Sequence, residues 1–161
     1  MEIIKITQVS DALAEMVALF RVELRSYKGI TSKPNIEAGR EEMEEYLAAG
    51  FPVFAAIVDG AYAGYVVCRV DSEVVWVESI FVKEEYRRHS VASALHNKAE
   101  EIAASYGEDT VYNYVHPNNH RMIEFLRKRG YTVLNLIEIR KPYQGEKLTQ
   151  TIVVGEHDFD Y

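Results

Sequence analysis

The sequence predicts an α+β domain in which helices pack on one mixed central sheet of about seven strands. Three runs rich in β-branched and aromatic residues follow one another between residues 53 and 82, with turn residues between them. Elsewhere, apolar residues recur at helical spacing over several turns. Taken along the chain, these patterns give the element order β-α-α-β-β-β-α-β-α-β-β.

A short strand and two helices are predicted before residue 50. Residues 3–6 form the strand, and Ser10 is a candidate N-cap with Asp11 in the first helical turn. The inward stripe of this first helix consists of Leu13, Met16, Val17, Phe20 and Leu24. After a loop at 27–34, the second helix spans about 35–49 and ends before Gly50 and Pro52.

The next three strands, at 53–58, 61–70 and 73–82, are close enough in sequence to form an antiparallel meander. Asp59-Gly60 is a strong hairpin turn between the first two, and Asp71-Ser72 leads into the third. After a polar segment at 83–90, a helix is predicted over 91–106, ending at Gly107.

Strands are predicted on both sides of one more helix in the remaining sequence. A strand at 110–115 precedes the helix at 119–129, which ends at Gly130. A strand follows at 131–139, and residues 151–154 are expected to pair with it. Residues 155–161 form an acidic tail.

The composition fits one soluble domain over residues 1–161, with 48% hydrophobic and 27% charged residues. The net charge of −7 argues against a nucleic-acid partner, because phosphate backbones need a basic surface. Cys68 is the single cysteine, which excludes an intramolecular disulfide and favours a reducing compartment. No apolar run reaches membrane-spanning length and no signal-peptide pattern is present, so we expect a cytoplasmic protein with no membrane partner.

The segment between the strand at 73–82 and the helix at 91–106 has the chemistry of a phosphate site. Main-chain N–H groups at a helix start are unpaired and point outward along the positive end of the helix dipole. Arg87, Arg88 and His89 add donors just before the helix, and the small Ala92 lets a ligand approach the backbone. On these residues alone, a solvated basic turn is an equal alternative.

This segment resembles the cofactor loop of the GNAT N-acetyltransferase superfamily, Gln/Arg-x-x-Gly-x-Gly/Ala after a strand that ends in Val. Arg87 matches the Gln/Arg position and Ala92 the last Gly/Ala, whereas Ser90 stands where the family has Gly. If the backbone at Ser90 needs a positive φ, serine costs about 1 kcal/mol more than glycine. The resemblance covers most of the chain and is most specific over residues 74–131.

The resemblance implies one acyl-CoA N-acyltransferase domain whose sheet is splayed between the strands at 73–82 and 110–115. The pantetheine arm of acetyl-CoA would lie in the splay as a pseudo-strand, bonded by the main chain of Ile80 and Val82. One of these N–H groups would stabilise the oxyanion. The full set of expected cofactor contacts is Ile80, Phe81, Val82, Arg87, Arg88, His89, Ser90, Val91, Ala92 and Asn119.

Glu78 is the candidate general base. By the period-two rule it lies on the same face of its strand as Trp76 and Ile80. A carboxylate among apolar neighbours holds a proton more tightly, which suits a base that takes a proton from an amine. Some small-amine enzymes of the family carry a glutamate at this position. The alternative is a carboxylate that only pairs with a cation.

The general acid is less well defined. The family's acid is a tyrosine seven residues after the asparagine that matches Asn119, and here that position is Leu126, which fits a core position. We place Tyr114 in this role, with Tyr112, Tyr131 and His116 as alternatives. A CoA thiol, with a pKa of about 8.5, also leaves without an acid. Asn119 is either a cofactor contact or a helix N-cap, and both roles are compatible.

His116 and His120 have a spacing that binds metals on a helix, but Pro117 separates them and no third ligand follows, so we expect no metal. Cys68 fits a buried, inert thiol.

The predicted function is acetyl transfer from acetyl-CoA to a primary amine of a small molecule. A peptide N-terminus or lysine as acceptor, a non-catalytic acyl-CoA-binding module and a nucleotide-binding protein are the alternatives, the last weakened by the missing Gly-x-x-x-x-Gly-Lys. Family members often dimerise, so a homodimer stays open, as do the acceptor and the acyl length.

Overall fold

Five strands form one sheet in the order β1-β2-β3-β4-β5, and they lie in the first of two compact units, Met1–Tyr114 and Val115–Tyr161. The computed structural model describes residues 1–161. The strands are β1 (Glu2–Lys5), β2 (Val53–Val58), β3 (Ala61–Asp71), β4 (Val74–Val82) and β5 (Tyr112–Asn113). Neighbours from β1 to β4 are antiparallel, and β5 is parallel to β4. The α+β class and the mixed sheet are therefore as predicted.

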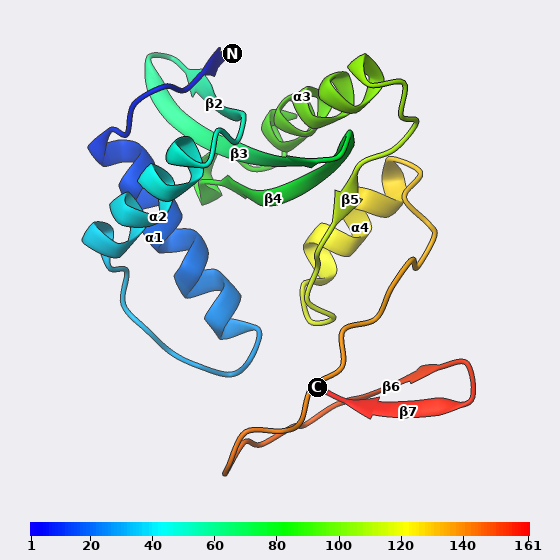
Figure 1. Cartoon of the computed structure of the whole chain (residues 1–161). Helices are drawn as coiled ribbons and strands as arrows, with labels where there is room; N and C mark the ends of the chain where they lie inside the picture. Colours follow the sequence, from blue (N-terminus) through cyan, green and yellow to red (C-terminus); the bar gives the residue numbers. More distant parts are fainter. The chain divides into compact units, whose positions relative to one another are not determined.

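Helices cover both faces of this sheet, as Figure 1 shows for α1, α2 and α3. The helices of this unit are α1 (Asp11–Ser26), α2 (Ile36–Ala48) and α3 (Val91–Ser105), with a short 3₁₀ turn, η1 (Glu84–Tyr86). Tyr65 and Phe81 belong to the core cluster that includes Leu13 and Met16 of α1. The adjacent Gly64 faces Leu95 of α3, so successive residues of β3 point to opposite faces of the sheet, one toward α1 and the next toward α3.

The ends of α1 and α2 follow local sequence rules. Ser10 accepts a hydrogen bond from the N–H of Leu13 at 3.3 Å, and Asn35 accepts one from the N–H of Ala38 at 3.1 Å. Arg21 joins α1 to α2, because its Nε donates a hydrogen bond to Glu42 of α2 at 2.7 Å. The hydrogen bond to Glu42 raises the pKa of Arg21, so the guanidinium stays charged at any physiological pH.

β4 and β5 separate almost as soon as they meet, which confirms the predicted splay. Only Trp76↔Tyr112 and Val77↔Asn113 are paired, so the part of β4 beyond Val77 has no strand on this side. The rings of Trp76 and Tyr112 lie 4.7 Å apart at the junction. The buried His96 of α3 lies 3.3 Å from Asn113, measured from Nε2 to Oδ1. Strand β5 is much shorter than the predicted 110–115.

A β-bulge interrupts β4 at Glu78. Val67 of β3 pairs with Ser79, and the next residue, Cys68, pairs with Val77, so Glu78 is the extra residue. The prediction that Trp76 and Ile80 share one face is therefore wrong. Their partners on β3 are Arg69 and Val66, which are an odd number of residues apart and face opposite sides.

The unit Val115–Tyr161 holds α4 (His120–Lys128) and a hairpin of β6 (Thr151–Val154) and β7 (His157–Asp160). The strand predicted at 131–139 is wrong, because this segment has no ladder partner and Val133, Leu134 and Leu136 are exposed. Strand β6 pairs with the supposed tail instead, around a turn at Gly155 with φ 64°. The turn between β6 and β7 has two residues, whereas pairing of β6 with residues 131–139 would require a longer loop, and closing a longer loop costs more conformational entropy. Two of the seven strands thus form a separate sheet. None of the helices is both long and apolar enough to cross a membrane.

Gly39 tests the packing of α2 on α1. A Cβ at this position would collide with the carbonyl oxygen of Ala14 and lie 3.0 Å from the main-chain nitrogen of Ala18. Alanine has the better helix propensity by about 1 kcal/mol, but a clash with rigid backbone outweighs it. We expect Gly39→Ala to lower the free energy of unfolding by about 1–3 kcal/mol in urea titrations. Glu41→Ala, at an exposed position of the same helix, is the control and should change it by less than about 0.5 kcal/mol. Equal stability of the two variants would contradict this packing.

Candidate active site

The loop between β4 and α3 contains two residues in the left-handed region. Arg88 has φ 64° and Ser90 has φ 61° with ψ 9°. Left-handed backbone costs a residue with a side chain roughly 1–2 kcal/mol, and glycine avoids this cost. Ser90 thus occupies the conformation for which the cofactor loop uses glycine. Such strain persists only where the surrounding structure holds it in place.

The N-terminus of α3 lacks a side-chain cap. Ser90 is the N-cap residue, but its side chain makes no capping hydrogen bond. Helices α1, α2 and α4 differ, since Ser10, Asn35 and Asn119 each accept a bond from a first-turn N–H. The first helical bond of α3 runs from the N–H of Ala94 to the oxygen of Ser90 at 3.0 Å. The N–H groups before Ala94 are therefore available to a ligand at the positive end of the helix dipole.

The side chains around this helix start differ in exposure. Arg88, His89 and Ser90 are exposed, Ala92 is half-buried, and Val91 is buried against the sheet. Val91 thus anchors the helix, whereas Arg88 and His89 are in solvent beside the uncapped N–H groups. A cation and an imidazole at such a place add to the attraction for an anion.

The free edge of β4 leads directly to this loop. The N–H of Lys83 donates to the oxygen of Ala63 at 2.9 Å, on the β3 side. Main-chain groups of successive residues alternate between the two sides of a strand, so those of Ile80 and Val82 point away from β3. This is the orientation that a pseudo-strand ligand needs. The side chain of Phe81 belongs to the core cluster, 6.5 Å from the ring of Tyr65.

Arg87 is engaged with protein groups. Its Nε donates to the main-chain oxygen of Val82 and its Nη2 to Glu23 of α1, each at 2.9 Å. Its guanidinium lies 5.7 Å from the centre of the Phe81 ring, and the main-chain N–H of Arg87 donates to the main-chain oxygen of Glu84 at 3.1 Å. Arginine has five N–H donors, so these bonds leave others for an anion. The main effect of the side chain, however, is to join the loop to α1 and to β4.

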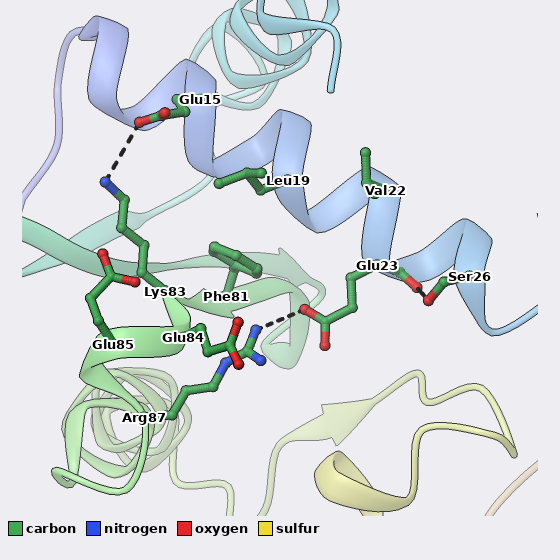
Figure 2. A pocket seen from close by; sticks show the side chains of 10 residues that line it. All are labelled: Glu15, Leu19, Val22, Glu23, Ser26, Phe81, Lys83, Glu84, Glu85 and Arg87. Atoms are coloured by element: carbon green, nitrogen blue, oxygen red, sulfur yellow. Dashed lines mark hydrogen bonds and ion pairs between the residues drawn. The ribbon is translucent and has the colours of Figure 1, made fainter. Parts of the chain in front are cut away.

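A pocket of about 480 Å³ lies between α1 and the segment from Phe81 to Arg87 (Figure 2). Leu19, Val22 and Phe81 are the apolar side chains among those that line it. Two ion pairs cross it, Lys83–Glu15 at 3.5 Å and Arg87–Glu23 at 2.9 Å, both drawn as dashed lines in Figure 2.

Glu78 and Tyr114, the two predicted catalytic residues, meet at Arg69. Arg69 donates from Nε to Glu78 at 2.9 Å, and its guanidinium lies 5.1 Å from the centre of the Trp76 ring. Tyr114 stacks on the same ring at 4.9 Å and 11°. Partial burial lowers the pKa of Arg69, but hydrogen bonds to Glu78 and Tyr114 and the charge of Glu78 outweigh it and raise that pKa. Arg69 therefore stays charged and keeps the carboxylate of Glu78 oriented.

Residues 16–131 match the acetyltransferase (GNAT) family. The chain belongs to this family. As a GNAT protein it is an acyltransferase, and the matched segment includes β4, the loop at 83–90 and α3. It also passes from the first compact unit into the second.

Solved GNAT structures share the fold. The aminoglycoside acetyltransferase AAC(6')-Iy, in complex with a CoA-based bisubstrate analogue, has a TM-score of 0.61 at 20% identity, over 88% of this chain and 97% of that one. AAC(6')-IG from Acinetobacter haemolyticus has 0.62 at 20% identity, over 88% and 99%. The ribosomal-protein-alanine N-acetyltransferase of Brucella melitensis biovar Abortus 2308 has 0.63 at 12% identity, over 89% and 100%.

The remaining residues that the resemblance singled out lie in the second unit. Asn119 is the N-cap of α4 and accepts a bond from the N–H of Met122 at 3.1 Å, so the capping role is confirmed. Its contact with the cofactor stays a prediction. Leu126 is buried, as expected of a core residue. His116 precedes α4, and its Nδ1 accepts a bond from the N–H of Asn118 at 3.1 Å.

Cys68 is buried in β3, and burial raises the pKa of its thiol to about 12. The prediction of a buried thiol is confirmed, and such a thiol is a poor nucleophile at neutral pH.

Sequence reasoning missed Arg69 and Glu23. Arg69 lies nine residues from Glu78 along the chain, and the hairpin register that the bulge sets decides which residue faces Glu78. Glu23 lies 64 residues from Arg87 and carries no local signal beyond its place in an amphipathic helix.

The strain at Ser90 predicts a gain in stability. Ser90→Gly removes the left-handed penalty and should raise the free energy of unfolding by about 1 kcal/mol. Ser93→Gly, inside the first turn of α3, makes the same chemical change where the backbone is helical and should lower it by about 0.5–1 kcal/mol. Urea titrations of both variants measure the difference. Equal losses in both would mean that Ser90 is not strained.

Proposed function

We propose that this GNAT protein transfers an acetyl group from acetyl-CoA directly to a primary amine, and that the acceptor is a small molecule. The observation that carries the proposal is the uncapped start of α3 behind a left-handed loop, next to the partnerless edge of β4. Both features leave main-chain donors without protein acceptors, in a chain whose family uses acetyl-CoA.

These residues fit the two polar parts of acetyl-CoA. The N–H groups at Val91 and Ala92 would bind the diphosphate, with Arg88 and His89 adding positive charge. The outward main-chain groups of Ile80 and Val82 would bond the pantetheine arm, as an added strand does. The carbonyl oxygen of Val82 holds one bond from Arg87 and has a second lone pair for the cofactor. When bound, acetyl-CoA supplies an activated acetyl thioester.

Glu78 is the proposed base. A direct transfer needs the ammonium of the acceptor to lose a proton before the nitrogen attacks the thioester carbon. The hydrogen bond from Arg69 orients the carboxylate of Glu78, which suits proton removal directly or through one water. The bulge places Glu78 outside the ladder between β3 and β4 and so re-aims its side chain.

Tyr114 is the proposed proton donor to the leaving thiolate. Its ring stacks on Trp76, and the guanidinium of Arg69, which donates to Glu78, lies over the same Trp76 ring. The proposed acid and base would thus lie beside the same arginine, Arg69. An uncatalysed departure of the thiolate is the alternative.

Two observations support a small-molecule acceptor. AAC(6')-Iy and AAC(6')-IG, which share the fold, are named for aminoglycosides, which are small polyamines. The net charge of −7 also favours a cationic acceptor. The alternative acceptor is a peptide N-terminus or lysine, because the Brucella enzyme of similar fold is named for a protein substrate. A non-catalytic acyl-CoA-binding module is the alternative of another class, on the strength of Leu126 and Ser90.

Ligand binding gives the first test. A ligand at 100 times its Kd adds about 2.7 kcal/mol to the stability of the folded state. Saturating acetyl-CoA should therefore raise the Tm by several degrees, whereas ATP, which lacks the pantetheine arm, should raise it much less. Dephospho-CoA is the matched ligand, because it keeps both the diphosphate and the arm. Stabilisation by ATP alone would refute a CoA site.

Glu78→Gln gives the second test. Loss of a general base should lower kcat at pH 7 by about 10²–10⁴-fold in an assay of thiol release across an amine panel. The deficit should shrink as the pH approaches about 10, because the amine then loses its proton to solvent. Glu73→Gln, near the start of β4, is the control and should keep full activity. Full activity of Glu78→Gln at every pH would remove Glu78 from the mechanism.

A further inference from the structure

We infer that Glu23 of α1 is a positioning residue for cofactor binding, acting through Arg87. The inference rests on the proposed CoA site and adds to it a residue from an element outside the loop. Glu23 Oε2 accepts a hydrogen bond from Arg87 Nη2 at 2.9 Å, and Arg87 Nε donates to the oxygen of Val82 at 2.9 Å. This series of contacts runs from α1 to the last residue of β4.

The second oxygen of Glu23 is also engaged. The hydroxyl of Tyr27 donates to Glu23 Oε1 at 2.9 Å, one helical turn further along. The carboxylate is thus held on both oxygens, and the side chains of Glu23 and Arg87 are only 23% and 24% exposed. A partly buried pair is screened less by salt than a surface pair, and its geometry is better defined.

The loop needs this support because its backbone is strained. Arg88 and Ser90, one and three residues after Arg87, are both left-handed. Such a conformation is retained when neighbouring contacts hold it, and the Arg87 side chain joins the loop to both α1 and β4. The same conformation leaves α3 uncapped and turns its free N–H groups toward the proposed diphosphate. Glu23 would therefore favour the binding-competent loop before the cofactor arrives.

Coulomb's law alone predicts the opposite effect of Glu23. A carboxylate near a diphosphate repels it, so removing the charge should tighten CoA binding. If Glu23 instead preorganises the loop, removing its charge should weaken binding. The sign of the change therefore separates the two roles.

The test is Glu23→Gln in the full chain, with the Kd for CoA measured by calorimetry. We expect the Kd to rise about fivefold or more, equivalent to one partly buried charged contact. The KM for acetyl-CoA should rise in parallel, while kcat at saturating substrates and the KM for the amine stay within about twofold. An unchanged or lower Kd would overturn the inference.

Glu15→Gln is the matched control. Glu15 is also on α1 and lines the same pocket, and its ion-pair partner is Lys83, which precedes η1. Unlike the side chain of Arg87, that of Lys83 donates no hydrogen bond to the main-chain oxygen of Val82. Its Kd for CoA should stay the same or fall slightly. Equal weakening in Glu15→Gln and Glu23→Gln would assign the effect to a general change in α1 and refute the specific role.

A double-mutant cycle with Arg87→Gln tests whether Glu23 acts through Arg87. If Glu23 acts through Arg87, then Glu23→Gln should add little to the Kd of the Arg87→Gln variant. Additive effects would overturn the inference. Circular dichroism and Tm of each variant verify the fold. Failure of the wild-type chain to bind CoA would refute the proposed function itself, so the two failures are distinguishable.

Discussion

The early separation of β5 from β4 is the constraint on which the rest of the site depends. Two residue pairs join these strands, and beyond Val77 the outward edge of β4 has no strand beside it. A continuous ladder would use the main-chain groups of Ile80 and Val82 and leave none for a ligand. The contacts of the Trp76 ring with Tyr112 and Tyr114 and the contact between His96 and Asn113 fix the point at which the strands part.

Local rules account for much of what the sequence predicted correctly. Ser10 and Asn119 were expected as N-caps and act as such, because a cap depends on residues within one turn of itself. The hairpin at Asp59-Gly60 follows for the same reason, with both residues at positive φ. A loop was correctly predicted between β4 and α3, because its signal lies within six consecutive residues, 87–92, and its contact with a cofactor stays a prediction.

The errors have long-range causes. The bulge at Glu78 depends on how β3 and β4 align, and a period-two pattern contains no information on an extra residue. The segment 131–139 alternates like a strand, yet a strand needs a partner, and β6 pairs with β7 across a shorter loop. The partner of Arg87 lies 64 residues away, so the residues of the loop alone did not indicate that this side chain also joins the loop to α1.

The contact between Arg87 and Glu23 changes how the charge of the loop is to be understood. Four carboxylates and two cations line the pocket between α1 and the loop, and Lys83 and Arg87 are each paired with a glutamate of α1. The positive potential available to a diphosphate therefore comes mainly from the uncapped N–H groups of α3, supplemented by the exposed Arg88 and His89. Fixed main-chain dipoles need little reorganisation when an anion binds, which is the condition for strong electrostatic stabilisation. In the proposed function, an acidic protein would in this way bind an anionic cofactor at one helix end, while the negative charge elsewhere would favour a cationic acceptor.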